Sequence, residues 1–111
     1  MKEPNVTSRL EKLQLMLQTE PDDTFLRYAL AMELRSLGRF EECLETFQSL
    51  MTEAHHVPAF FMAAQTWAEL GRLNEARQAL RDGIALARSQ GDHHAAGEMS
   101  ELLASLGAMG E

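Results

Sequence analysis

The chain of 111 residues is 45% apolar and carries a net charge of −7, so it can form one domain with its own core and lacks the basic character of nucleic-acid-binding proteins. It contains no run of about 18 apolar residues that would span a membrane, and its first residues lack the apolar stretch of a signal peptide, so we expect a cytoplasmic protein. A single cysteine, Cys43, excludes an internal disulfide and a cysteine-based zinc site.

The first predicted helix is a flanking helix within residues 1–20. Leu10, Leu13 and Leu17 are three and four residues apart, so a helix places them on one face. A second stripe of apolar residues covers residues 24–37 and follows a proline and two aspartates, which favour a helix start. Both segments therefore predict amphipathic helices that bury one side.

Glycines separate the next predicted helices. Gly38 ends the second helix, because a residue without Cβ adopts the left-handed turn without steric cost, and a third apolar stripe follows over residues 40–51. Gly71 ends, for the same reason, a fourth helix that starts near Pro58, a residue suited to the first helical turn. The two turns therefore predict two helical hairpins.

Two more stripes complete the chain. One covers residues 74–90 and is followed by Gly91, and Asp92 can cap a last helix that carries Met99 and Leu106 on its apolar face. No segment alternates apolar and polar residues with the period of two that a strand requires. We therefore predict an all-α fold, a right-handed solenoid of antiparallel helix pairs with about five helices.

Two stretches nearly repeat each other 33 residues apart, LRSLGRFEECLETF at 34–47 and WAELGRLNEARQAL at 67–80. A helix–turn–helix unit that recurs near 34 residues, with small and large apolar residues at fixed places, resembles the tetratricopeptide repeat. The positions that match its motif are Arg27, Leu30, Ala31, Leu34, Cys43 and Phe47 in the first unit, and Phe60, Ala63, Ala64, Trp67, Ala76 and Leu80 in the second.

Neither unit has the tyrosine of that motif at its place, and the first unit departs from the motif at two further positions. Arg27 stands where the motif has a large aromatic residue, and Cys43 stands where it has alanine. The resemblance implies a single domain, because one helical hairpin cannot bury its own apolar face and neighbouring hairpins must stack. Residues 1–111 then divide into a flanking N-terminal helix at 1–20, repeats at 21–56 and 57–91, and a capping C-terminal helix at 92–111.

Part of the acidic charge has a local explanation. Six acidic residues fall where a helix should begin, and there they complement the helix dipole. These are Asp22, Asp23, Glu41, Glu42, Glu75 and Asp92. We therefore do not take the negative charge as evidence for a basic partner. Arg77, Arg81 and Arg88 share one face of the helix over 74–90, where a solvated face with ion pairs is favoured over a site for an acidic partner.

The four histidines come as two pairs, His55–His56 and His93–His94, each at the turn that enters a new repeat. Stacked repeats would place both pairs on one edge, where zinc or nickel would accept imidazole ligands. Adjacent side chains on a turn diverge, however, so solvated turn residues are favoured over a metal site. We predict no metal, with a metal-binding protein as a minor alternative.

No catalytic motif occurs in the chain. There is no glycine-rich phosphate loop, no serine in a nucleophile elbow and no His-Glu-x-x-His helix. No cationic residue neighbours Cys43 in the sequence, so this thiol is expected to pack as a small apolar residue and not to react. We predict that the protein is not an enzyme and holds no cofactor.

In tetratricopeptide arrays the first helix of each repeat lines a concave surface that holds a peptide or a helix. The resemblance therefore implies a partner-binding strip that consists of Phe25, Tyr28, Met32, Phe61, Met62 and Gln65. These residues do not form the cationic clamp that grips a C-terminal carboxylate in the best-known variety of the family. Two phenylalanines, a tyrosine and two methionines facing outward would make an exposed apolar surface, which is typical of an interface.

We therefore predict a protein–protein interaction module, an adaptor or scaffold that binds a peptide or helix in an apolar groove. Its partner would be another protein, with no nucleic acid and no membrane involved. Two alternatives remain: self-association of a structural protein, for example as a homodimer, and a terminal helix that folds over the strip and makes it part of the core.

Overall fold

The computed structural model describes residues 8–110, with side chains placed from Arg9 to Gly107. This part of the chain contains six α-helices and no strand, so the expected all-α fold is confirmed, with one helix more than the five or so predicted. The helices are α1 Ser8–Thr19, α2 Thr24–Ser36, α3 Phe40–Glu53, α4 Val57–Glu69, α5 Leu73–Ser89 and α6 His93–Gly110. The predicted flanking helix at 1–20 is described only from residue 8.

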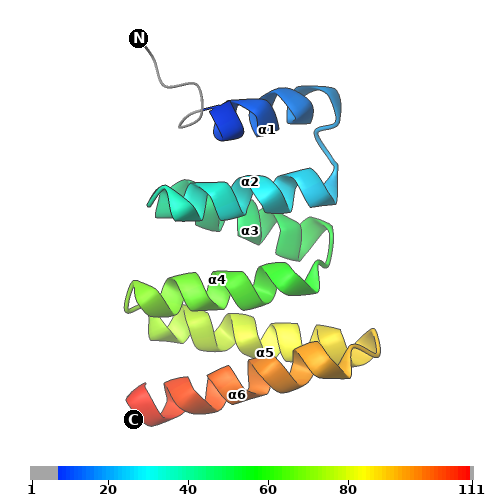
Figure 1. Cartoon of the computed structure of the whole chain (residues 1–111). Coiled ribbons are helices and arrows are strands. Elements are labelled where there is room, and N and C mark those ends of the chain that lie inside the picture. Colours follow the sequence, from blue (N-terminus) through cyan, green and yellow to red (C-terminus); the bar gives the residue numbers. More distant parts are fainter. Residues whose placement is uncertain (1–7, 111) are drawn as a thin grey trace.

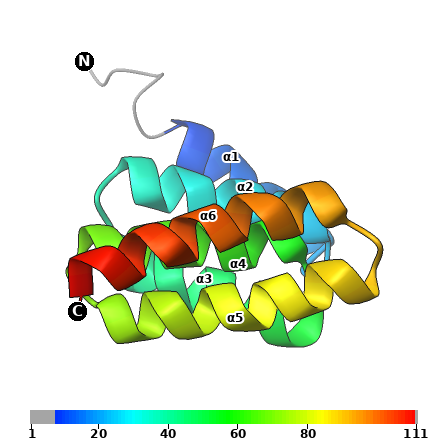
Figure 2. The ribbon, with the colours of Figure 1, turned by 90° about the horizontal axis from the view of Figure 1, so that it is seen from below.

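The helices form one stack in which consecutive helices are antiparallel neighbours, from α1 at one end to α6 at the other (Figure 1). The first helices of the hairpins, α2 and α4, lie with α6 on one side of the stack, and α3 and α5 lie on the other side (Figures 1 and 2). The body measures 50 × 28 × 19 Å, an elongated shape that arises because each hairpin packs only on its neighbours in the stack. None of the described helices has the length and apolarity that crossing a membrane requires.

Glycines and aspartates define the helix ends, as the sequence predicted. Gly38, Gly71 and Gly91 have φ angles of +77°, +79° and +77°, and each follows the end of a helix. Asp23 accepts a hydrogen bond from the Leu26 amide at 2.9 Å, and Asp92 accepts one from the Ala95 amide at 3.1 Å. These carboxylates cap α2 and α6, which confirms a local role for part of the acidic charge.

The core is continuous from α1 to α6. The two repeat alanines, Ala31 and Ala64, are fully buried, as are Phe47 and Leu80 on the second helices. Trp67 is also buried, which confirms it as a core residue. Large side chains thus fill the space beside close helix crossings that only small residues permit.

Gly83 in the middle of α5 marks another close approach, which the sequence analysis did not identify. A Cβ built on this glycine would lie 2.7 Å from Met99 Sδ and 2.8 Å from Phe60 Cβ. Both distances are shorter than van der Waals contact, so α5 comes this close to α4 and α6 only because residue 83 has no side chain. In the sequence, an isolated glycine within a helix indicates only lower helix propensity.

Candidate functional site

The helices α2, α4 and α6 share one register. Each contains a buried alanine that is followed three residues later by a large buried side chain, in the pairs Ala31–Leu34, Ala64–Trp67 and Ala96–Met99. Four positions around this alanine follow helical spacing and share one side of their helix: six and two residues before it, and one and five residues after it. On this side Met32 and Met62 are only partly exposed, because they also pack against the core. This surface, called the first-helix face below, consists of Phe25, Ala29, Met32 and Ser36 on α2, Pro58, Met62, Gln65 and Glu69 on α4, and His94, Gly97 and Glu101 on α6.

None of the residues of the first-helix face is buried. Phe25 is 78% exposed in the first turn of α2, an unusual place for an aromatic ring. Met32, Met62 and Gln65 are half-buried on the same face. The structure therefore brings four of the six residues of the predicted strip onto one surface.

The other two predicted strip residues, Tyr28 and Phe61, occupy equivalent positions three residues before the repeat alanine. Both are half-buried and pack against the core, as Met32 and Met62 also do. The Tyr28 ring lies 5.9 Å from the Phe47 ring and 5.1 Å from the His56 imidazole, where it makes an edge contact. Tyr28 therefore lies partly between hairpins, and its removal would disturb packing as well as the surface.

Partial burial shifts the pKa of both Tyr28 and His56. Burial raises the pKa of Tyr28, although the positive charge of Arg35 opposes this, and burial lowers the pKa of His56. His56 is the residue before α4, so its ring reaches α2 from the turn between the two hairpins. The neutral imidazole is the form that this position favours.

Acidification is therefore expected to destabilise the fold through His56. Because the pKa of His56 in the folded chain is below its ordinary value of 6.5, the unfolded chain binds the proton more readily, and stability falls as pH drops below about 6.5. Urea unfolding of His56→Gln should show a smaller loss of stability between pH 7.5 and 5.5 than the parent. A pH dependence in His56→Gln equal to that of the parent would contradict the prediction.

Ion pairs connect α2 to its neighbours at the edges of the first-helix face. Arg35 on α2 reaches α4, where its Nη2 lies 2.6 Å from Glu69 Oε2 and its Nε donates to Thr66 Oγ1 at 2.9 Å. On the other side, Arg9 Nε on α1 lies 3.0 Å from Glu33 Oε1. These contacts engage both arginines with carboxylates of the protein itself.

The two histidine-bearing turns are neighbours, as expected from stacking. Gln90 Nε2 donates to the backbone oxygen of His55 at 3.3 Å, which joins the turn before α6 to the turn before α4. Within residues 8–110 no group of three or more histidine, cysteine, aspartate or glutamate side chains could hold a metal ion. Solvated turn residues remain our interpretation of His55, His93 and His94, which are all exposed.

Cys43 lies fully buried in α3. Burial raises the pKa of its thiol to about 11, with Arg35 acting weakly in the opposite direction. The thiol is therefore protonated at neutral pH, whereas nucleophilic or metal-binding cysteines are thiolates. This agrees with the interpretation of Cys43 as a small core residue.

The prediction that Arg77, Arg81 and Arg88 form one solvated face is wrong for Arg77. Arg77 is half-buried, and its guanidinium donates to the backbone oxygen of Leu106 at 3.0 Å and to Asn74 Oδ1 at 3.2 Å. Arg77 thus connects α5 to the C-terminal part of α6, where the helix dipole favours a cation. Only Arg81 and Arg88 remain exposed.

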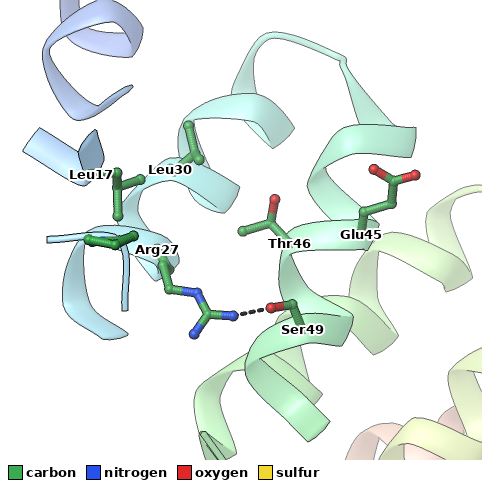
Figure 3. A pocket seen from close by; sticks show the side chains of 7 residues that line it. Leu17, Arg27, Leu30, Glu45, Thr46 and Ser49 are labelled. Carbon is green, nitrogen blue, oxygen red and sulfur yellow. Dashed lines mark hydrogen bonds between the residues drawn. The ribbon is translucent and has the colours of Figure 1, made fainter. Parts of the chain in front are cut away.

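A hollow lies between α1, α2 and α3, beside Arg27 (Figure 3). Its volume is about 330 Å³, and it is lined by Leu17, Pro21, Arg27, Leu30, Glu45, Thr46 and Ser49. The Arg27 guanidinium donates to Ser49 Oγ and lies 2.9 Å from Glu53 Oε1. The equivalent residue of the second repeat, Phe60, is buried. The substitution of arginine for an aromatic ring therefore explains the hollow without a ligand.

The comparisons with known proteins agree on a repeat architecture. Residues 8–83, about two thirds of the chain, match the protein family described as anaphase-promoting complex, cyclosome, subunit 3. No curated protein matches the chain in sequence.

Among solved structures, BPP2914 from Bordetella parapertussis has 27% sequence identity and a TM-score of 0.77, over 90% of this chain and 88% of its own. A tetratricopeptide repeat domain protein from Salinibacter ruber has 26% identity and a TM-score of 0.73, over 78% of this chain and 88% of its own. PcrH, crystallised in complex with the chaperone binding region of PopD, has 21% identity and a TM-score of 0.82, over 92% of this chain and 78% of its own. The PcrH comparison shows a shared fold.

Proposed function

The chain belongs to the family described as anaphase-promoting complex, cyclosome, subunit 3, a family of tetratricopeptide-repeat type, and from this premise we propose that it binds a segment of another protein on the first-helix face. One observation carries the proposal: the 78% exposed Phe25 lies on the same face as the half-buried Met32 and Met62. An exposed aromatic ring that lies on the same face as partly exposed methionines is typical of an interface, and methionine adapts to the shape of a partner.

The arrangement of the terminal helices supports an accessible face. α1 packs on α2, and α6 packs on α5 and α4, each through its apolar stripe. Leu10 and Leu13 of α1 and Met99 and Leu106 of α6 are buried in these contacts. Neither helix buries Phe25. This disfavours the alternative in which a terminal helix folds over the strip and makes it part of the core.

Two further considerations support a binding role and not catalysis. The structure of PcrH with the chaperone binding region of PopD is an example of this fold holding a segment of a second protein. In the present chain, the buried Cys43 has a raised thiol pKa, and the exposed histidines form no cluster with other ligating side chains in residues 8–110. A stacked helical repeat offers an extended surface instead.

The proposal predicts that two serine substitutions on the first-helix face abolish binding. Phe25→Ser with Met62→Ser should lower capture of partners from a lysate at least about tenfold, because both side chains would lose apolar contact area in the complex. Circular dichroism should remain helical, since neither residue is fully buried.

The matched control is Leu15→Ser with Met16→Ser, which removes two residues of α1 that are 61% and 50% exposed. It should leave capture unchanged. Light scattering compares the molecular mass of the parent with that of both variants and so tests the alternative of self-association. A dimer that becomes a monomer only in the face variant would make a second copy the partner, and capture that survives in the face variant would overturn the proposal.

A further inference from the structure

The acidic residues at the helix starts have different surroundings from those in the interior of α6. At the helix starts, Asp23 and Asp92 cap backbone amides, and Glu42 and Glu75 lie 2.7 and 3.1 Å from Arg39 and Arg72. These acids are therefore explained by the stability of their own helices. The acids in the interior of α6 are not at a helix start and need another explanation.

Glu98 and Glu101 lie in the second and third turns of α6, a helix that contains no lysine or arginine. Glu101 is exposed on the first-helix face, and Glu98 lies one turn before it with a half-exposed side chain. The nearest cationic group to Glu98 is the exposed His94, at 3.6 Å, which is charged only when protonated. At neutral pH this part of the face therefore carries negative charge that the helix itself does not neutralise.

The described residues of α2 and α4 contain only two cations, Arg27 and Arg35. Arg27 is engaged with Ser49 and Glu53 on the side of α3, and Arg35 with Glu69. Neither is therefore free to balance the charge of α6. Glu69 on α4 is paired with Arg35, so the carboxylates without an arginine partner lie on α6, beside the apolar side chains of Phe25, Met32 and Met62.

We propose that the occupant of the first-helix face is a protein segment that combines large apolar side chains with lysine or arginine. Its apolar side chains lie over Phe25, Met32 and Met62, and its cation lies against Glu98 and Glu101. The inference rests on the proposed function and adds the chemistry of the partner. Charge complementarity favours this occupant over an acidic segment, and over a second copy of this chain, whose net charge is −7.

Gly97 supports this placement of the cation. It lies between His94 and Glu101 on the face, and a Cβ built on it would meet no atom within 4 Å. Because no side chain rises from this position, a long lysine or arginine side chain can lie along α6 and reach both carboxylates. Nothing within the fold requires a glycine there.

The test selects peptides from a displayed library of random 12-residue sequences against the full chain. Enriched peptides should carry a net positive charge and at least two large apolar residues. Fluorescence anisotropy with the synthetic peptides should show Kd weakened about three- to tenfold by Glu98→Gln with Glu101→Gln. The matched control, Glu41→Gln with Glu45→Gln, removes the same charge from exposed residues of α3 and should leave Kd unchanged.

The outcomes separate this inference from the proposed function. Suppose that the peptides lose binding to the Phe25→Ser with Met62→Ser variant. If they are neutral or acidic, or if the α6 variant binds them as tightly as the parent does, the inference is overturned and the proposed function stands. Peptides that are equally weakened by the α6 variant and the α3 control would overturn it as well, because the attraction would then come from net charge alone. If no peptide is enriched, or if the Phe25 and Met62 substitutions leave the Kd of the peptides unchanged, both proposals fail.

Discussion

Replacement of Phe47 by alanine is expected to lower the free energy of unfolding by about 3–5 kcal/mol, because the ring is fully buried and its loss leaves a cavity in the middle of the stack. Phe47 lies on α3 and contacts Tyr28 on α2, with 5.9 Å between ring centroids. A chain of this length has a total stability of about 5–15 kcal/mol, so the variant should unfold at much lower urea concentration.

Phe25→Ala is the matched control, because it removes the same ring from a position where it is 78% exposed. Its effect on the urea midpoint should stay within about 0.5 kcal/mol. If Phe47→Ala leaves too little folded protein to measure, Phe47→Leu, with an expected loss of about 1 kcal/mol, provides the measurement. Equal losses at residues 25 and 47 would contradict the assigned repeat register.

Replacement of Gly83 by alanine is expected to destabilise the fold by about 1–3 kcal/mol, although alanine is the better helix former by about 1 kcal/mol. The added Cβ would lie 2.8 Å from Phe60 Cβ, an atom close to the backbone of α4 that cannot rotate away. Met99 Sδ, at 2.7 Å, can move more easily, so the contact with α4 dominates the cost. Thermal unfolding followed by circular dichroism measures the change.

Gly97→Ala on α6 is the control and should change stability in the opposite direction. Its Cβ would enter open space, so only the gain in helix propensity remains, about 0.5–1 kcal/mol of stabilisation. A stabilising Gly83→Ala would show that α5 is not held as close to α4 as the structure indicates. A destabilising Gly97→Ala would show that this glycine has a role within the fold.

The predicted strip shows which features of the candidate site follow from the sequence and which do not. Helical spacing and the family resemblance predict a partner-binding strip, and the structure places four of its residues, Phe25, Met32, Met62 and Gln65, on the first-helix face. The spacing did not separate these residues from Tyr28, whose ring lies against Phe47 and His56. Adjacent positions on a helix differ by about 100°, so the rotation of α2 against its neighbours decides which side chains point outward.

Local features of this protein were determined by the sequence itself. The helix ends at Gly38, Gly71 and Gly91 and the caps at Asp23 and Asp92 all appear as predicted. Each depends on a backbone conformation or a hydrogen bond within three or four residues, so the information lies in a short window of the chain.

Other features were decided only by the tertiary structure. Arg77 appeared to belong to an exposed basic stripe, but it donates to the carbonyl of Leu106, 29 residues away. Gly83 was indistinguishable from Gly97 in the sequence, yet only Gly83 lies against Phe60 and Met99. The reason is the same in both cases. The distance between two packed helices depends on every side chain at their crossing, so the periodicity of residues along one helix does not determine this distance.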